Sequence, residues 1–298
     1  MKSATSSTSA KVVRKTTDKA TSRKSCVQST NKSIEPGQIT VLDDHGSSVL
    51  YLPKALWTTS SSSSYSSYSS SSSLSGFSAI QNSSTSKWPD QCFQRLLSEC
   101  PWAQGAIKIF GKEIPEPRLT CYFGEHSYKY SGRLLQRAPF DGATCPKVVA
   151  EVKREVERIL SVFFSSDNLS KRTLSSKVQH IEDASRPIEF NSVLLNRYRT
   201  LTDSQGWHSD DEAVYGKDPA IASVSLGCER DFVFRRKISE KEKWTLKLEH
   251  GSLLFMFGPI QHHWQHSLPK RTGKASSMQE QQERINLTFR KIVNPMKV

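Results

Sequence analysis

Arg284-Ile285-Asn286-Leu287-Thr288-Phe289-Arg290 is the stretch of sequence that decides the fold. Its polar and apolar side chains alternate strictly, and a period of two predicts a β-strand. One interpretation is an antiparallel strand with its polar face in water. The other places the polar face inside a barrel, where buried guanidinium groups need a planar anion as partner. A dicarboxylate bound beside a metal ion would meet that need.

The sequence upstream of this strand predicts many further strands. Short apolar runs separated by turns, with no long helical pattern between them, begin after Glu189. The expected strands are residues 190–199, 221–226, 231–236, 244–248, 252–257, 264–268 and 285–293. Many strands joined by short turns indicate a barrel or a two-sheet jelly roll. We therefore predict a mainly β fold with flanking helices (α+β) around a jelly-roll core.

Two earlier segments show helical spacing of apolar residues. The first begins at Trp88-Pro89 and is stopped by Pro101, and the second runs from Lys147 to Phe164. Both are expected to support the core.

Between these helices, residues 106–112 predict a strand that turns at Gly111. Pro115 and Pro117 are expected to prevent a central strand directly after it. Residues 165–186 are polar and Lys-rich, and the sequence predicts no structure for them.

The motif His208-Ser209-Asp210 is a candidate metal site. In an extended segment alternate side chains share a face, so His208 and Asp210 project the same way. A third donor is expected from a second segment, which offers His262, His263 and His266. Two histidines and one carboxylate with open positions are the arrangement of non-haem Fe(II) oxygenases. Spacing alone does not choose among the three histidines.

These motifs occur in an order that resembles a known family. The chain is similar to the AlkB family of Fe(II)- and 2-oxoglutarate-dependent nucleic-acid dioxygenases, and most similar to the eukaryotic branch that repairs duplex DNA. The resemblance runs from about Trp88 to the C-terminus. It is carried by Asn196-Arg197-Tyr198, His208-x-Asp210, residues 222–227, residues 230–235, His266-Ser267-Leu268-Pro269 and Arg284-x-Asn286-x-Thr288-x-Arg290.

The resemblance implies a double-stranded β-helix, which is a jelly roll, and a reaction. Members of the family remove N-methyl groups oxidatively from bases such as N1-methyladenine and N3-methylcytosine, with release of formaldehyde. Fe(II), O2 and 2-oxoglutarate take part, and ascorbate serves as reductant. Two alternatives stay open: a demethylase of RNA or single-stranded nucleic acid, and a nucleic-acid-binding protein with a vestigial iron site.

The resemblance also implies roles for individual residues. It assigns iron to His208, Asp210 and His266. It assigns the co-substrate to Asn196, Tyr198, Arg284, Asn286 and Arg290. It assigns contacts with the nucleic acid to Phe110, Arg118, Tyr128, Tyr130, Ser131, Gly132, Asp211 and Glu212.

Three of the nucleic-acid assignments have a physical reason. Phe110, flanked by Lys108 and Lys112, has the character of a wedge that separates base steps. Tyr130 stands where the family has phenylalanine, and its ring face can still stack on an extruded base. Glu212 would complement a cationic methylated base.

The N-terminal third of the chain has a different composition. Residues 1–87 are dominated by Ser and Thr, which cannot bury enough apolar surface to offset chain entropy. We expect a disordered tail over 1–87 and a dioxygenase domain over 88–298, with nucleotide recognition and helical support in 88–189 and the jelly-roll core in 190–298. The apolar islands at 38–42 and 49–52 favour transient order in a linker over an appended strand pair.

Charge and targeting signals suggest the partner and the compartment. The formal net charge is +13, and residues 88–298 hold 32 basic and 25 acidic residues, which favours a polyanionic partner. The resemblance implies that this partner is DNA, with duplex favoured, and leaves RNA open. No apolar run is long enough to span a membrane, and a monomer is expected. The basic Ser/Thr-rich N-terminus favours the nucleus, with a mitochondrion or plastid as alternative.

Overall fold

Two β-sheets packed face to face form the body of the protein. The computed structural model describes residues 31–57, 87–109, 112–130, 132–165, 188–271 and 283–296. The large sheet has the strand order β2 (Ile39–Val41), β3 (Ser48–Leu52), β13 (Ser252–Phe257), β10 (Ile221–Gly227), β15 (Arg284–Arg290), β8 (Ser192–Tyr198), β5 (Lys112–Gly124), β4 (Ala103–Ile109). The small sheet has the order β1 (Asn31–Ser33), β12 (Ser239–Leu248), β11 (Arg230–Arg236), β14 (Trp264–Leu268), β9 (Gln205–His208). The predicted jelly-roll core is confirmed.

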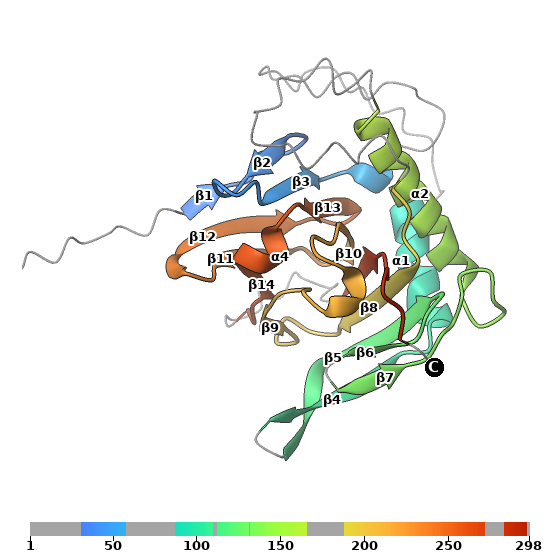
Figure 1. Ribbon diagram of the computed structural model, residues 1–298. Coiled ribbons are helices and arrows are strands. Elements are labelled where there is room, and N and C mark those ends of the chain that lie inside the picture. The colour runs from blue at the N-terminus through green and yellow to red at the C-terminus, as the bar shows by residue number, and fades with distance from the viewer. Residues whose placement is uncertain are drawn as a thin grey trace, which may run out of the picture.

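Helices cover one face of the large sheet, and the small sheet covers the other. The helices α1 (Trp88–Glu99) and α2 (Lys147–Phe163) lie side by side along the large sheet (Figure 1). Their apolar faces join a core that includes Ile285, Leu287 and Phe289 of β15. Because side chains alternate along a strand, the polar side chains of β15 point the other way, toward the small sheet. All seven residues of β15 are buried, which confirms the interpretation that places its polar face inside the barrel.

The first part of the β4–β5 hairpin agrees with the expectation that Pro115 and Pro117 prevent a central strand. The strand β5 begins at Lys112 and passes through both prolines as an edge segment. Over residues 112–115 β5 pairs with β4, and its pairing with β8 begins at Leu119. The two prolines therefore lie where β5 has a ladder on one side, so their missing N–H groups cost no bond to β8. This part of the hairpin extends from the body as an arm (Figure 1).

The prediction of a disordered tail up to Lys87 is wrong for residues 31–57. The strand β3 pairs antiparallel with β13 along five residues, and β2 pairs with β3 (Figure 1). Val49 and Leu50 are wholly buried. The apolar islands are thus an appended strand pair, and their stability comes from an edge strand of the core rather than from their own sequence. Residues 1–30, 58–86 and 166–187 lie outside the described residues.

The variant Leu50→Ala tests whether this segment is part of the folded body. We expect the free energy of unfolding to fall by about 2 to 5 kcal/mol, because a buried leucine leaves a cavity when it is truncated. Urea denaturation of the full chain measures the change. The control is Ile238→Ala, since Ile238 is 83% exposed. Equal, small losses in both variants would mean that the segment is not docked in solution.

The structure also describes five cysteines and tests the expectation that no segment spans a membrane. Four of the described cysteines, Cys92, Cys100, Cys121 and Cys145, are buried, and Cys228 is half-buried; all five are free. Among the described helices, none has the length and apolar character needed to cross a bilayer.

Candidate active site

Three predicted metal ligands meet between two neighbouring strands of the small sheet. β9 ends at His208, and His266 lies directly opposite it on β14. One donor atom each from His208, Asp210 and His266 lies within 4.8 Å of the others. No other group of three or more His, Cys, Asp or Glu residues in the described part of the chain is so arranged. The structure therefore selects His266 from the three candidate histidines.

The other two histidines of that segment are engaged elsewhere. His262 and His263 belong to the short helix α4 (Ile260–His263), which precedes β14. The ring of His262 contacts the Lys217 carbonyl and the Asp218 carboxylate, with 3.2 Å to Asp218 Oδ1. His263 stacks on His45 with ring centroids 4.3 Å apart. Neither belongs to the cluster.

Hydrogen bonds hold His208 in the form that a metal ligand requires. Its Nδ1 lies 2.9 Å from the Gly206 carbonyl oxygen, which can only accept, so Nδ1 carries the proton. Its Nε2 then has a lone pair, which faces the side-chain amide of Gln205 at 2.9 Å. The backbone N–H of Asp210 donates to Gln261 Oε1 at 3.0 Å. The sequence gives no sign of the roles of Gln205 and Gln261, because only strand pairing brings them to the motif.

The charge state of the cluster suits a divalent cation. Burial alone would raise the pKa of Asp210, but the nearby positive charge of Arg290 and the two histidines lower it to about 2. Burial lowers the pKa of His266 to about 3 and also lowers that of His208. At neutral pH the cluster is therefore one carboxylate and two neutral imidazoles, the forms that bind a metal.

The two arginines of β15 are buried, and Arg290 lies beside this cluster. Arg290 Nη2 is 2.8 Å from Asp210 Oδ1. Arg284 Nη2 donates to Ser225 Oγ at 2.9 Å, and its guanidinium lies 5.2 Å from the ring centre of Tyr198. Burial lowers the pKa of Arg284 to about 10. The buried Nε atoms of Arg284 and Arg290, like Asp210 Oδ2, have no hydrogen-bond partner among the described residues.

The predicted co-substrate residues of β8 and β15 are paired on neighbouring strands of the large sheet. Asn196 is opposite Asn286, and Tyr198 is opposite Arg284. The Tyr198 hydroxyl donates to Gln205 Oε1 at 3.1 Å, which links β8 to His208. The amide of Asn286 is already paired with Ser223, the Val224 carbonyl and Thr288. Asn286 therefore holds β15 to β10, while the Tyr198 ring lies 5.2 Å from the Arg284 guanidinium.

Arg118 joins the co-substrate side of the site to the aromatic side. Its Nε donates to Asn196 Oδ1 at 2.8 Å, and its Nη2 donates to the Tyr130 hydroxyl at 2.8 Å. Nη2 also contacts the buried carboxylate of Glu116 at 2.9 Å. Glu116, which the sequence analysis missed, balances the charge of Arg118; its position between two prolines carries no local signal.

The aromatic side is a small hairpin, β6 (Tyr128–Tyr130) and β7 (Arg133–Leu135). Tyr128 is buried and Tyr130 is half-buried, with ring centroids 6.5 Å apart, while Lys129 is exposed. Gly132 has φ 81°, in the left-handed region that favours glycine, so the turn of the hairpin needs it. The predicted contacts Phe110 and Ser131 lie outside the described residues.

The two acidic residues after Asp210 have different environments. Asp211 is exposed and pairs with Lys237 at 3.3 Å. Burial and the charge of Asp210 raise the pKa of Glu212, whose Oε2 is buried without a partner. Tyr215, which the sequence analysis did not select, packs against Arg290 at 5.5 Å and Tyr128 at 5.9 Å. Its ring therefore lies next to the arginine that pairs with the metal ligand Asp210.

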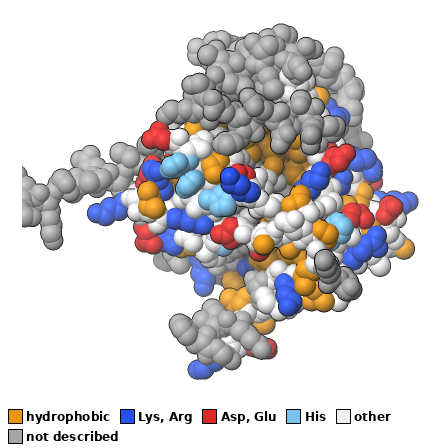
Figure 2. All heavy atoms as spheres, viewed as in Figure 1, with side chains coloured by type: hydrophobic (Ala, Val, Ile, Leu, Met, Phe, Trp, Pro, Cys, Tyr) orange, Lys and Arg blue, Asp and Glu red, His pale blue; other side chains and the backbone are white. Residues whose placement is uncertain are grey.

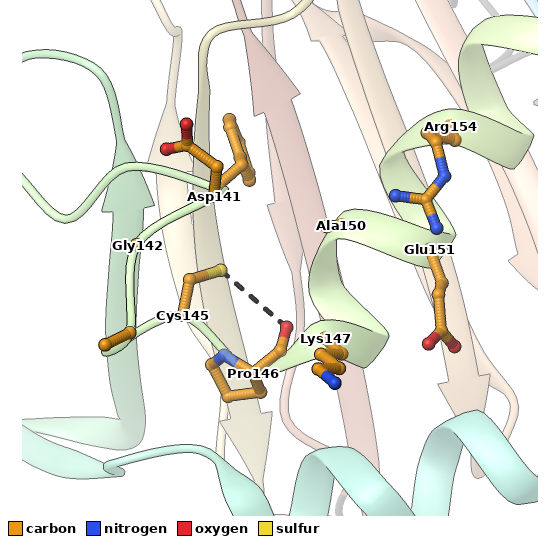
Figure 3. Close-up of a pocket in the computed structure, with 10 residues that line it drawn as sticks. Asp141, Gly142, Cys145, Pro146, Lys147, Ala150, Glu151 and Arg154 are labelled. Carbon is orange, nitrogen blue, oxygen red and sulfur yellow. Dashed lines mark hydrogen bonds between the residues drawn. The ribbon is translucent and has the colours of Figure 1, made fainter.

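A separate pocket of about 610 Å³ opens beside the start of α2 (Figure 3). Phe140, Cys145, Lys147, Glu151 and Arg154 are among its lining residues. The Cys145 thiol donates to the Pro146 carbonyl at 3.7 Å (Figure 3). None of the predicted iron, co-substrate or nucleic-acid residues lines this pocket, so it is not the site described above.

The donor set fits a metal ion with a bound dicarboxylate. Two neutral imidazoles and a carboxylate suit iron and leave coordination positions open. Asp210 Oδ2 lacks a partner on the cluster side, and the arginine Nε atoms lack an anion. A dicarboxylate would supply that anion, since carboxylates bind guanidinium groups in a planar, bidentate manner.

Comparison with known proteins agrees with this geometry. Residues 76–290 match the 2OG-Fe(II) oxygenase superfamily. The chain is 31% identical to the DNA oxidative demethylase ALKBH2 of Arabidopsis thaliana, over 90% of this chain and 73% of that protein. It is 36% identical to human ALKBH2, over 68% of this chain and 69% of that protein. It is 33% identical to mouse alpha-ketoglutarate-dependent dioxygenase alkB homolog 3, over 69% of this chain and 62% of that protein. The chain belongs to the 2OG-Fe(II) oxygenase superfamily, in its AlkB family, whose cofactors are Fe(II), 2-oxoglutarate and O2.

Proposed function

We propose that this protein repairs DNA by oxidative demethylation of alkylated bases of the N1-methyladenine and N3-methylcytosine type, with duplex DNA as the favoured substrate. The observation that carries the proposal is the meeting of His208, Asp210 and His266 with the buried Arg290 of β15. Relatives named DNA oxidative demethylase support DNA as the substrate.

Different residues of the core would bind the iron and the co-substrate. His208, Asp210 and His266 would hold the iron, Arg284 and Arg290 would bind the carboxylates of 2-oxoglutarate, and Asn196 and Tyr198 would support the co-substrate. The bound iron, with 2-oxoglutarate and O2, supplies the oxidation of the N-methyl carbon, after which formaldehyde leaves. The salt bridge from Arg290 to Asp210 keeps the carboxylate ionised and in place. Tyr215 packs against Arg290 and is backed by Tyr128, and the buried Arg290 is shielded from water.

The hairpin β6–β7 and the segment after Asp210 would bind the base. Tyr130 would offer its ring face for stacking, with the buried Tyr128 packed beside it, and Gly132 lies next to them at a positive φ. Ser131 is a further proposed contact. Asp211 and Glu212 would favour the positive charge of a methylated base. Arg118 is hydrogen-bonded to both Tyr130 and Asn196, so it would fix the position of the Tyr130 ring relative to the co-substrate.

The remaining parts of the proposal concern the partner and the compartment. We place residues 88–298 on DNA as a monomer, with binding that weakens steeply as salt rises. Basic side chains are spread over the face in Figure 2 with acidic ones among them, so contacts to phosphate would be distributed. The nucleus is the proposed location, with mitochondrion or plastid as alternative. RNA and single strands remain the alternative substrates, and a vestigial iron site the alternative class.

Formaldehyde release tests the proposal directly. An oligonucleotide with one N1-methyladenine is offered as duplex and as single strand, with Fe(II), 2-oxoglutarate and ascorbate. We expect formaldehyde release that requires every component and is faster on the duplex. Faster release on the single strand or on RNA would favour the alternative substrates. No release with iron bound would overturn the proposal in favour of a binding protein.

The variant Phe110→Ala tests the duplex preference. Loss of a wedge should lower kcat/KM on the duplex by about tenfold or more, because unstacking a base step costs a few kcal/mol. Single strands need no unstacking, and their kcat/KM should change little. Ile114→Ala, an exposed residue of the same arm, is the control. Equal losses on both substrates would remove the wedge from the proposal.

A further inference from the structure

The N-terminal segment contacts the strand that carries His266. Residues 31–57 lie outside the part of the chain that matches the superfamily, residues 76–290. The loop between β2 and β3 nevertheless reaches the start of β14. There Asp43 Oδ2 accepts a hydrogen bond from the indole N–H of Trp264 at 2.7 Å. Trp264 is wholly buried, and Asp43 is 9% exposed.

The loop is built so that the carboxylate of Asp43 is fixed. Its other oxygen, Oδ1, accepts the backbone N–H groups of His45 and Ser47 at 3.0 and 3.1 Å. Both oxygens of Asp43 are therefore occupied, one by its own loop and one by β14. A short hydrogen bond to an ionised acceptor is stronger and more directional than a neutral one.

Trp264 connects this carboxylate to the two segments that carry the metal ligands, residues 208–210 and the strand β14. Its carbonyl oxygen accepts the hydroxyl of Ser209 at 2.9 Å, and Ser209 is the residue between His208 and Asp210. His266 follows two positions later in β14, so its side chain projects to the same face as the Trp264 side chain. A shift of the indole would therefore move the backbone that carries all three ligands.

Docking of the segment does not depend on Asp43. β3 is paired with β13 along its whole length, and its side chains are buried in both cores. The Tyr51 hydroxyl also donates to the Lys247 carbonyl at 2.7 Å. The bond from Asp43 to Trp264 is thus one of many contacts that dock the segment. It differs from the bond of Tyr51 because it reaches β14, the strand that carries His266.

We propose that Asp43 is a positioning residue for the metal site, acting through Trp264. The segment 31–57 is then part of the active-site support rather than an appendage. This inference rests on the metal site of the proposed function but not on its substrate. Groups that orient metal ligands typically contribute 10- to 100-fold to metal affinity.

The test measures metal affinity in the full chain without substrate or turnover. Mn(II) serves as a redox-stable probe, and free Mn(II) is followed by electron paramagnetic resonance. The variants are Asp43→Asn, whose single carbonyl oxygen cannot serve both the loop and the indole, and Trp264→Phe, which keeps a ring but loses the donor. Tyr51→Phe is the matched control, because it removes a bond of similar length that docks the same segment to β12. Melting temperatures without metal report the effect on folding.

Asp43→Asn and Trp264→Phe are expected to weaken Mn(II) binding by about 10- to 100-fold. The double variant is expected to lose no more Mn(II) affinity than the weaker-binding single variant, since both substitutions remove the same hydrogen bond. Tyr51→Phe is expected to lower the melting temperature and leave the Mn(II) affinity within about twofold of the unaltered protein. Unchanged affinity in Asp43→Asn, or an equal loss in Tyr51→Phe, would overturn the positioning role alone. Absence of Mn(II) binding by the unaltered protein would overturn the metal site as well.

Discussion

Asp210→Asn is expected to lower formaldehyde release by about a thousandfold or more, which is the largest effect we predict for any single replacement. The carboxylate is the only anionic member of the cluster formed with His208 and His266. A metal site that loses its charged ligand loses several kcal/mol of transition-state stabilisation, at about 1.4 kcal/mol per tenfold in rate. Turnover on duplex N1-methyladenine DNA, with a parallel Mn(II) titration, measures both consequences.

The same replacement is expected to destabilise the metal-free protein. Asp210 and Arg290 form a buried ion pair at 2.8 Å, with each side chain about 5% exposed. Removing one partner leaves an uncompensated buried charge, which costs about 3 to 5 kcal/mol of unfolding free energy. Asp231→Asn is the control, since Asp231 pairs with Arg271 at the surface. Retained activity in Asp210→Asn would refute the metal assignment.

Arg284→Met is expected to raise stability and abolish co-substrate binding at once. Arg284 is buried with Ser225 and the Tyr198 ring as its neighbours, and no carboxylate of the residues that the structure describes forms an ion pair with it. A methionine of similar length removes the charge, so we expect a gain of about 1 to 4 kcal/mol in unfolding free energy. The KM for 2-oxoglutarate should rise about a hundredfold or more, because two charge-assisted hydrogen bonds are lost.

Thermal melting with and without 2-oxoglutarate measures both parts of this prediction. At a hundred times its dissociation constant, a ligand adds about 2.7 kcal/mol to the stability of a protein that binds it. The unaltered protein should show that shift and Arg284→Met should not. Arg199→Met is the control, because Arg199 has Asp203 as its partner. A full shift in Arg284→Met would place the co-substrate elsewhere.

Local pattern predicted the parts of the fold whose signals lie within one segment. The alternation of Arg284 to Arg290 predicted the strand, and the structure decided between its two interpretations by burying the polar face. The helical spacing of residues 147–164 matches α2 within one residue. Short strands such as β9 were not predicted, because four residues with a half-buried pattern carry no clear period.

The sequence by itself determined the chemistry of this protein: which residue types carry charge, which strand carries two arginines on one face, and which motif supplies an imidazole beside a carboxylate. Spacing alone left His262, His263 and His266 open and the resemblance assigned His266, but only the tertiary structure brings His266 opposite His208, because strand register between β9 and β14 is a long-range property. It also decided that Asp43 reaches Trp264 across more than two hundred residues of chain. The reason is physical: side-chain identity is local, whereas burial and pairing depend on partners that no neighbouring residue specifies.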